Sequence, residues 1–231
     1  MNENMSVPEA GDKKKSTTLI IAGTVLFGVI IAAIVFLQGR EDTVPEVADN
    51  SSGGSLLASG YEVVPSTARF TERSGKDMTL GDLRGDIWVA SFIFTRCRGT
   101  CPAMTTALGE LQGELESVGD VRLVSFTVDP EYDTPERLQE YAEEYGASDE
   151  RWLFLQGSDS AVQELAKNTF HVGIAEGTSE EEPIIHSSRF FLVDHNGEIR
   201  GMYDGRSKQG QQKLLDDVRT LIQERRNGRG A

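Results

Sequence analysis

The sequence of 231 residues has only two cysteines and three histidines, and its 37 acidic residues outnumber its 23 basic ones. Two cysteines exclude a scaffold held together by several disulfides. The formal net charge of −14 argues against a nucleic-acid partner, because such a partner requires a basic surface. Structural zinc takes four ligands, for which two cysteines and scattered histidines are a poor set. The remaining composition, 38% hydrophobic and 26% charged, is that of a folded chain.

One apolar run, Leu19 to Leu37, carries no charged residue. At about 1.5 Å per residue it is just long enough to cross a hydrocarbon core of roughly 30 Å. Lysines at 13–15 precede the run and acidic residues at 41–42 follow it, so the positive-inside rule predicts a cytoplasmic N-terminus. A cleaved signal peptide is the alternative, although no A-x-A site follows the run. No cysteine follows it either, so a lipoprotein anchor is not supported.

These features predict a single-pass membrane protein whose soluble domain lies on the outer, periplasmic or extracytoplasmic side of a bacterial inner membrane. The residues after the apolar run are rich in Ser, Gly, Asp and Glu, which is typical of a flexible tether. The expected organisation is a cytoplasmic tail (1–18), a transmembrane anchor (19–38), a flexible linker (39–60), a folded domain (61–224) and a tail (225–231).

The domain has alternating strand and helix patterns. Short apolar runs rich in β-branched and aromatic residues predict strands, and apolar residues at helical spacing predict helices. Pro135 after Thr134 predicts a capped helix start, and Asn196-Gly197 predicts a hairpin turn. The expected strands are 87–94, 121–128, 152–155, 189–193 and 198–203, and the expected helices are 102–117, 135–145, 159–169 and 208–224.

This order predicts an α/β fold. Strands joined through helices lie parallel, whereas the final hairpin adds antiparallel strands. The sequence therefore predicts a mixed central sheet with helices on both faces, of which the thioredoxin-like fold is one example.

Cys97 and Cys101 lie between a predicted strand and a predicted helix, where ligands commonly bind. The positive end of the helix, together with Arg96 and Arg98, favours thiolates of lowered pKa. The spacing is C-x-x-x-C rather than the C-x-x-C of dithiol oxidoreductases. Two soft thiolates select soft ions such as Cu(I), and an added imidazole also accommodates Cu(II).

The three histidines differ in their surroundings. His171 ends a predicted helix, where a structural role is expected, and His195 precedes the hairpin turn, where we expect it to face solvent. His186 lies just before the strand 189–193. In a thioredoxin-like fold the loop that enters this strand faces the cysteine loop, so His186 is the candidate third ligand.

Three segments together are similar to the Sco (SenC/PrrC) family: FIFTRCRGTCPAMT at 92–105, SFTVDPEYDTPERL at 125–138 and HSSRFFLVDHNGEI at 186–199. They occur in the order and spacing of that family. The resemblance covers roughly residues 61–222 and implies a thioredoxin-like domain that binds copper and supports assembly of the binuclear copper centre of cytochrome c oxidase.

The resemblance also implies site residues and partners. The metal-binding cysteines of the family fall on Cys97 and Cys101, and its histidine ligand falls on His186. Asp129 matches the aspartate of the V-D-P segment, where it either supports the site or shapes the loop before Pro130. The implied partners are the copper-bearing subunit of the oxidase and a copper donor protein.

Two other functions use the same residues. A thiol–disulfide oxidoreductase that acts on the cysteines of a copper-accepting protein needs a redox-active Cys97–Cys101 disulfide but not His186. A peroxidase-like enzyme on the same fold needs one activated cysteine in a pocket, and nothing in the sequence indicates such a pocket.

Overall fold

The computed structural model describes residues 56–57, 59–148, 150–173, 175–176, 184–185 and 187–228. The chain divides into two compact units, Met1–Asp49 and Asn50–Ala231, and all of the described residues belong to the second. The predicted anchor (19–38) and His186 lie outside the described residues. Within the described ranges, no helix has both the length and the apolar character needed to cross a membrane.

A seven-stranded sheet forms the centre of this unit, in the order β2-β1-β5-β4-β3-β8-β9. β3, β4 and β5 are parallel, and the other neighbouring pairs are antiparallel, so the predicted mixed sheet is confirmed. A separate pair of short strands, β6 (Ala175–Glu176) and β7 (Ile184–Ile185), is antiparallel. The strands of the main sheet are β1 (Arg69–Glu72), β2 (Asp77–Thr79), β3 (Ile87–Ile93), β4 (Val121–Thr127), β5 (Trp152–Gln156), β8 (Arg189–Val193) and β9 (Ile199–Asp204).

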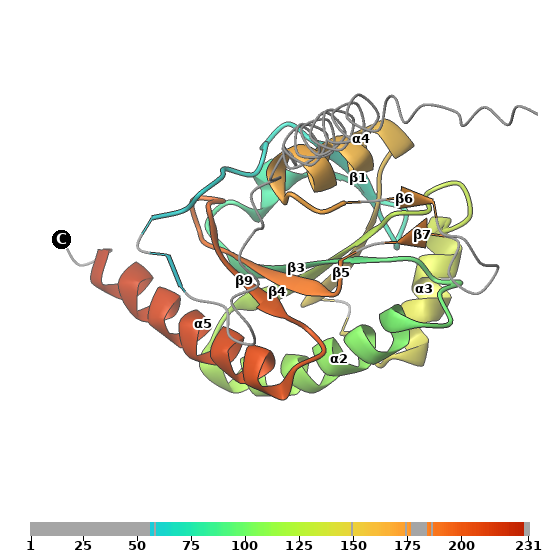
Figure 1. The fold of residues 1–231 in the computed structure, drawn as a ribbon. Coiled ribbons are helices and arrows are strands. Elements are labelled where there is room, and N and C mark those ends of the chain that lie inside the picture. Colours follow the sequence, from blue (N-terminus) through green and yellow to red (C-terminus); the bar gives the residue numbers. More distant parts are fainter. Residues whose placement is uncertain are drawn as a thin grey trace, which may run out of the picture. The chain divides into compact units, whose positions relative to one another are not determined.

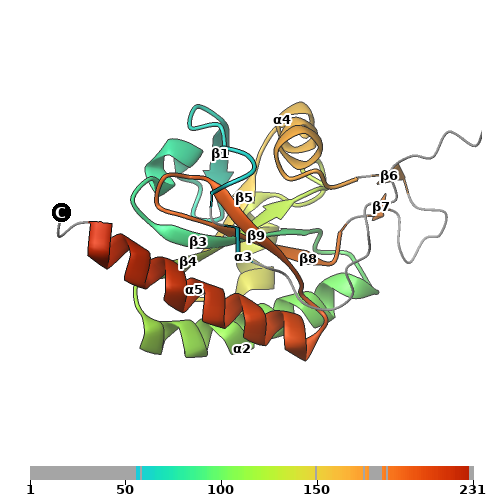
Figure 2. The same ribbon diagram turned by 60° about the vertical axis from the view of Figure 1, so that its left-hand side comes forward.

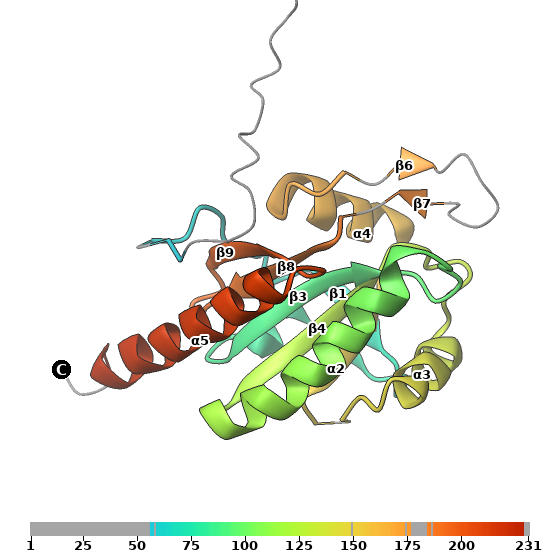
Figure 3. The same ribbon diagram turned by 60° about the horizontal axis from the view of Figure 1, so that its bottom comes forward.

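Helices lie on both faces of the sheet, as the sequence predicts. α2 and α5 lie side by side below the sheet in Figures 1 and 2, and α4 lies above it. Figure 3 shows α2 and α5 in front of the strands and α3 beside them. The helices are η1, a 3-10 turn (Leu80–Leu83), α2 (Thr100–Val118), α3 (Pro135–Glu144), α4 (Asp159–Glu164), η2, a π-helical turn that continues α4 (Leu165–Thr169), and α5 (Lys208–Gly228).

Local signals fix several of these boundaries. The Thr134 hydroxyl accepts a hydrogen bond from the Arg137 N–H at the start of α3, as its sequence predicts. At the hairpin turn, Gly197 has φ 73°, a conformation that glycine adopts at low cost. α2 differs from its prediction, because it begins at Thr100 instead of Pro102. Cys101 therefore lies in the first helical turn.

The sequence-based prediction leaves out η1 and the β6–β7 pair, and it also leaves out two parts that belong to the main sheet. One is the β1–β2 hairpin, whose short strands pair at the edge of the sheet. The other is the stretch before the predicted domain start. The Leu57 N–H donates to the backbone carbonyl of Arg200 in β9, and the Arg200 side chain donates to the Leu57 carbonyl. The described end of the expected linker is thus bound to the sheet.

The two faces of the sheet have different cores. On the α4 face, Phe170 packs edge-on against Phe92, with ring centroids 5.4 Å apart. On the opposite face the buried Ser125 hydroxyl lies 2.9 Å from the Ser91 hydroxyl and accepts a 2.9 Å hydrogen bond from the Trp152 indole N–H. A polar link at the centre of three parallel strands thereby satisfies a buried donor.

Substitution of Ser125 by Ala leaves the buried Trp152 N–H without its acceptor. We expect the free energy of unfolding to fall by about 1–3 kcal/mol in urea titrations. Ser117→Ala, which removes an exposed hydroxyl bonded to a carbonyl of its own helix, is the matched control and should change it by less than about 0.5 kcal/mol. Equal stability of the two variants would contradict this view of the core.

Candidate metal centre

The cysteine loop, residues 94–99, joins β3 to α2. The Cys97 N–H donates to the Phe94 carbonyl at 3.2 Å, which closes a tight turn at the end of the strand. Cys101 follows in the first turn of α2, and the two thiol groups are hydrogen-bonded to each other. Both residues are buried, with exposed fractions of 6% for Cys97 and 0% for Cys101. The structure therefore brings the two predicted sulfur ligands together.

The environment of Cys101 differs from the one that the sequence predicts. The hydrogen bond to Cys97 and the burial of the thiol raise the pKa of Cys101, while the Phe94 backbone acts in the opposite direction. The buried thiol has no contact with water that would stabilise its charge. The predicted lowering of the pKa is thus wrong for Cys101. A metal that binds here has to displace a proton.

The Arg96 side chain contacts the loop that follows β4. Its Nε donates to Asp129 Oδ2 at 2.6 Å, and its guanidinium carbon lies 4.8 Å from the ring centre of Tyr132. Arg137 covers the same ring at 3.9 Å. Asp129, which is 8% exposed, therefore contacts the cysteine loop through Arg96. Arg98 is exposed to solvent.

Asp133 is a site residue that the sequence analysis does not single out. Its fully buried carboxylate accepts hydrogen bonds from the Thr95 N–H at 3.0 Å, the Thr95 hydroxyl at 2.5 Å and the Thr127 hydroxyl at 2.5 Å. Burial raises the pKa of Asp133, whereas these three donors lower it. Its negative charge also contributes to the raised pKa of Cys101.

Below the cysteines, α2 and α3 are joined by hydroxyl groups. The Thr105 hydroxyl donates to the Cys101 carbonyl at 2.9 Å and lies 2.7 Å from the Tyr141 hydroxyl. Burial raises the pKa of Tyr141, so its hydroxyl stays protonated. Because the Thr105 proton points to the carbonyl, Tyr141 donates to Thr105. This contact supports the first turn of α2 from beneath.

Two of the three histidines lie in the described residues. His171 ends the helical segment at φ 51° and stacks on Tyr61, with ring centroids 6.0 Å apart. His195 lies in the turn after β8. Because β8 is antiparallel to β3, with Val193 opposite Trp88, this turn lies at the end of the sheet away from the cysteine loop. Neither histidine joins the cysteines: within the described ranges, which leave out His186, no three His, Cys, Asp or Glu side chains gather as a metal site would require.

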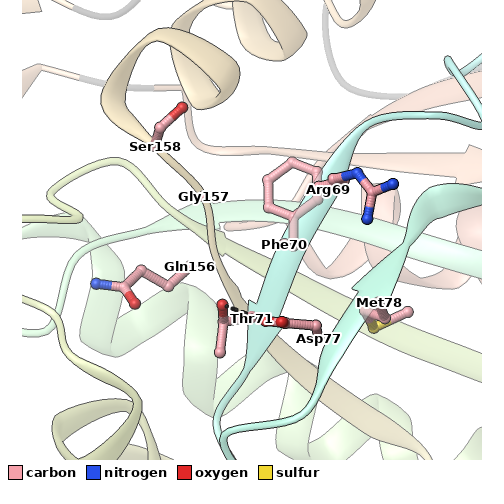
Figure 4. A pocket seen from close by; sticks show the side chains of 8 residues that line it. All are labelled: Arg69, Phe70, Thr71, Asp77, Met78, Gln156, Gly157 and Ser158. Atoms are coloured by element: carbon pink, nitrogen blue, oxygen red, sulfur yellow. Dashed lines mark hydrogen bonds between the residues drawn. The ribbon is translucent and has the colours of Figure 1, made fainter.

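One pocket opens at the edge of the sheet (Figure 4), with a volume of about 370 Å³. None of its lining residues belongs to the cysteine loop. One of them, Gln156, donates to the Pro130 carbonyl at 2.6 Å and so reaches the loop of Asp129. The pocket is lined by Arg69, Phe70, Thr71, Asp77, Met78, Gln156, Gly157 and Ser158.

Comparison with known proteins shows similarity across most of the folded unit. A family model described as SCO1/SenC matches residues 62–223. The "SCO1 protein homolog" of Bacillus subtilis is 38% identical over 162 residues, which cover 69% of this chain and 82% of that protein. A "putative copper-binding protein" of Stutzerimonas stutzeri is 30% identical over 143 residues, which cover 59% of this chain and 67% of that protein.

A solved structure agrees with these relatives. BsSco, described as a member of the Sco family of cytochrome c oxidase assembly proteins with a disulfide switch, is 36% identical to this chain. The superposition has a TM-score of 0.64 and covers 72% of this chain and 97% of BsSco. For several other curated relatives, the matched region spans between 56% and 63% of their length.

The thiol environments predict unequal reactivity. In the native, reduced chain at neutral pH, we expect iodoacetamide to alkylate Cys101 at least about tenfold more slowly than Cys97, because only thiolates react and each pKa unit removes a factor of ten in their fraction. Peptide mass spectrometry separates the two products. In concentrated urea the two rates should become equal. Equal rates in the native chain would be incompatible with the protected Cys101 thiol.

Proposed function

The chain belongs to the SCO1/SenC family, and from this premise we propose that it is a copper metallochaperone for the binuclear copper centre of cytochrome c oxidase. Cys97, Cys101 and His186 hold the metal, as Cu(I), Cu(II) or both. The observation that carries the proposal is the buried pair of thiols at the end of β3. Two soft sulfur ligands, one in the cysteine loop and one in the first turn of α2, suit copper, and an added imidazole suits both of its oxidation states.

The strand register supports His186 as the third ligand. Ala90 lies opposite Phe191 and Trp88 opposite Val193, so β8 starts beside the end of β3 that leads into the cysteine loop. Ser187 and Ser188, which immediately precede β8, lie at that same end. The residue before them is the one that the family resemblance assigns as a ligand. His195, at the far end of β8, is unsuited to this role.

The residues around the thiols act on protons and on geometry. Cys97 and Cys101 share a hydrogen bond, so copper replaces a proton between the two sulfur atoms as it binds. Asp129 neutralises the charge of Arg96 in the cysteine loop. Arg98 of the same loop is exposed to solvent and lies next to Cys97 in the sequence. Burial of both cysteines keeps water from the bound metal. Release to the copper-bearing subunit of the oxidase therefore requires acceptor ligands that enter the loop.

The same thiol pair supports a second function. Hydrogen-bonded contact between the Cys97 and Cys101 side chains also suits a dithiol that oxidises to a disulfide while it reduces a disulfide in a copper-accepting protein. Two electrons and two protons pass to the acceptor in that exchange. His186 takes no part in it, so this histidine distinguishes the two functions.

Copper binding to variants of the purified full chain tests the assignment. We expect the reduced wild type to retain one Cu(I) per chain after gel filtration and metal analysis, and Cys97→Ser or Cys101→Ser to lose it. His186→Ala should weaken binding by more than about a hundredfold, because even residues behind a ligand contribute roughly 10–100-fold. His195→Ala is the matched control and should bind as the wild type does.

Each other outcome has a defined meaning. Unchanged affinity in His186→Ala would exclude the three-ligand site. No retained copper in the wild type, together with rapid and reversible formation of a Cys97–Cys101 disulfide, would favour the oxidoreductase.

We also propose that residues 19–38 anchor the chain in a bacterial inner membrane, with a cytoplasmic tail at 1–18 and the folded domain on the outer side. The copper donor protein and the oxidase subunit then meet the domain outside the cytoplasm. Alkaline phosphatase fused to the C-terminus should be active in cells, since this enzyme folds only outside the cytoplasm. A fusion that lacks residues 1–38 should be inactive. An inactive full-length fusion that is stably expressed would contradict this orientation.

A further inference from the structure

The Asp133 side chain links the cysteine loop to the end of β4 and the loop that follows it. From its contacts we propose that Asp133 is a positioning residue, which fixes the relative placement of Cys97 and Cys101 and thereby sets how tightly the pair holds a metal or a disulfide. This inference rests on the cysteines as the site of the proposed copper function. It assigns to Asp133 a role distinct from that of Asp129, whose carboxylate is bound to Arg96.

The Asp133 carboxylate accepts two hydrogen bonds from Thr95. Oδ2 of Asp133 accepts the Thr95 backbone N–H, and Oδ1 accepts the hydroxyl of the same residue. Two bonds to one residue fix its orientation as well as its position. Thr95 comes two residues before Cys97, and the turn that contains Cys97 starts at Phe94. The direction in which the chain leaves β3 toward the first thiol is therefore set by a side chain 38 residues away in the sequence.

The same carboxylate is tied to the end of β4. Its Oδ2 also accepts the Thr127 hydroxyl, and that hydroxyl oxygen accepts the Asp129 N–H at 3.0 Å. Asp129 in turn binds Arg96, which precedes Cys97. A continuous network thus runs from Thr95 through Asp133, Thr127 and Asp129 back to Arg96. The network thus holds two residues of the cysteine loop, Thr95 and Arg96, against the end of β4 and the loop that follows it.

Burial of a carboxylate costs free energy, so stabilisation of a loop alone does not explain Asp133. Removal from water destabilises its charge, and burial raises the pKa of Asp133 accordingly. Three donors offset this cost, and all of them come from residues next to the two loops. A neutral side chain of similar size avoids the cost of burying a charge but cannot accept all three hydrogens with one oxygen. Accurate placement of the thiols accounts for the presence of the charge at this position.

Variants of Asp133 and Thr95 in the full chain test the role. Thr95→Val keeps the shape of the side chain but removes one donor, and Asp133→Asn leaves one carbonyl oxygen for three donors. Thr95→Ser restores the hydroxyl and is the rescue variant. Asp120→Asn, an exposed aspartate in the turn before β4, is the control for loss of charge.

Two readouts report on the thiols themselves. The first is the equilibrium constant between dithiol and Cys97–Cys101 disulfide in a glutathione buffer, in which one glutathione disulfide is reduced to two thiols for each disulfide formed. The second is the rate at which bound Cu(I) passes to a chelator. We expect Thr95→Val and Asp133→Asn to shift the equilibrium constant by about tenfold and to speed copper release by a similar factor. Thr95→Ser and Asp120→Asn should stay within about twofold of the wild type.

The outcomes separate this inference from the proposed function. If Thr95→Val lowers the melting temperature but changes neither the disulfide equilibrium nor copper release, Asp133 is only a structural residue and the inference is overturned. If the wild type holds no copper while the disulfide equilibrium shifts as expected, the positioning role stands and the copper function fails. Thr95→Val keeps the test decisive should Asp133→Asn not fold.

Discussion

The parallel, in-register pairing of β3 with β4 is the constraint on which the site depends. Ile93 lies opposite Thr127, and the Val128 N–H donates to the Ile93 carbonyl at 2.8 Å just beyond the ladder. Both strands therefore end at the same edge of the sheet, and their following loops emerge side by side. Without this alignment, Asp133 could not reach Thr95, and Arg96 could not reach Asp129. The chemistry of the cysteines is thus a consequence of a backbone register.

Burial at the start of α2 determines how readily the Cys101 thiol loses its proton. Cys101 lies within the first turn of a helix whose inner face packs against the sheet, so its side chain is removed from water. A helix N-terminus favours a thiolate. Here the hydrogen bond to the neighbouring thiol and the burial of the side chain raise the pKa of Cys101. The Cys101 thiol thus stays protonated when no metal is bound, and a metal that binds here displaces its proton. That behaviour suits a protein that carries copper better than one that attacks many substrates.

The sequence predicts most of the fold because its signals are local. The apolar run of β3, the cap at Thr134 and the turn at Asn196-Gly197 each specify a nearby backbone conformation. What it misses at the site depends on partners distant in the chain. The residue separation between Thr95 and Asp133 is 38, and no pattern near either residue indicates the contact. The raised pKa of Cys101 likewise depends on how the helix packs, whereas motif reading considers only the helix end and nearby arginines.

X-ray absorption at the copper edge, recorded on the full chain loaded with one equivalent of Cu(I), tests the central claim most directly. The spectrum identifies the atoms bound to the metal. It requires neither an activity assay nor a variant protein. We expect two sulfur scatterers, from Cys97 and Cys101, and one nitrogen scatterer, from His186. A spectrum with only nitrogen or oxygen scatterers would show that the buried thiol pair at the end of β3 is not the copper site.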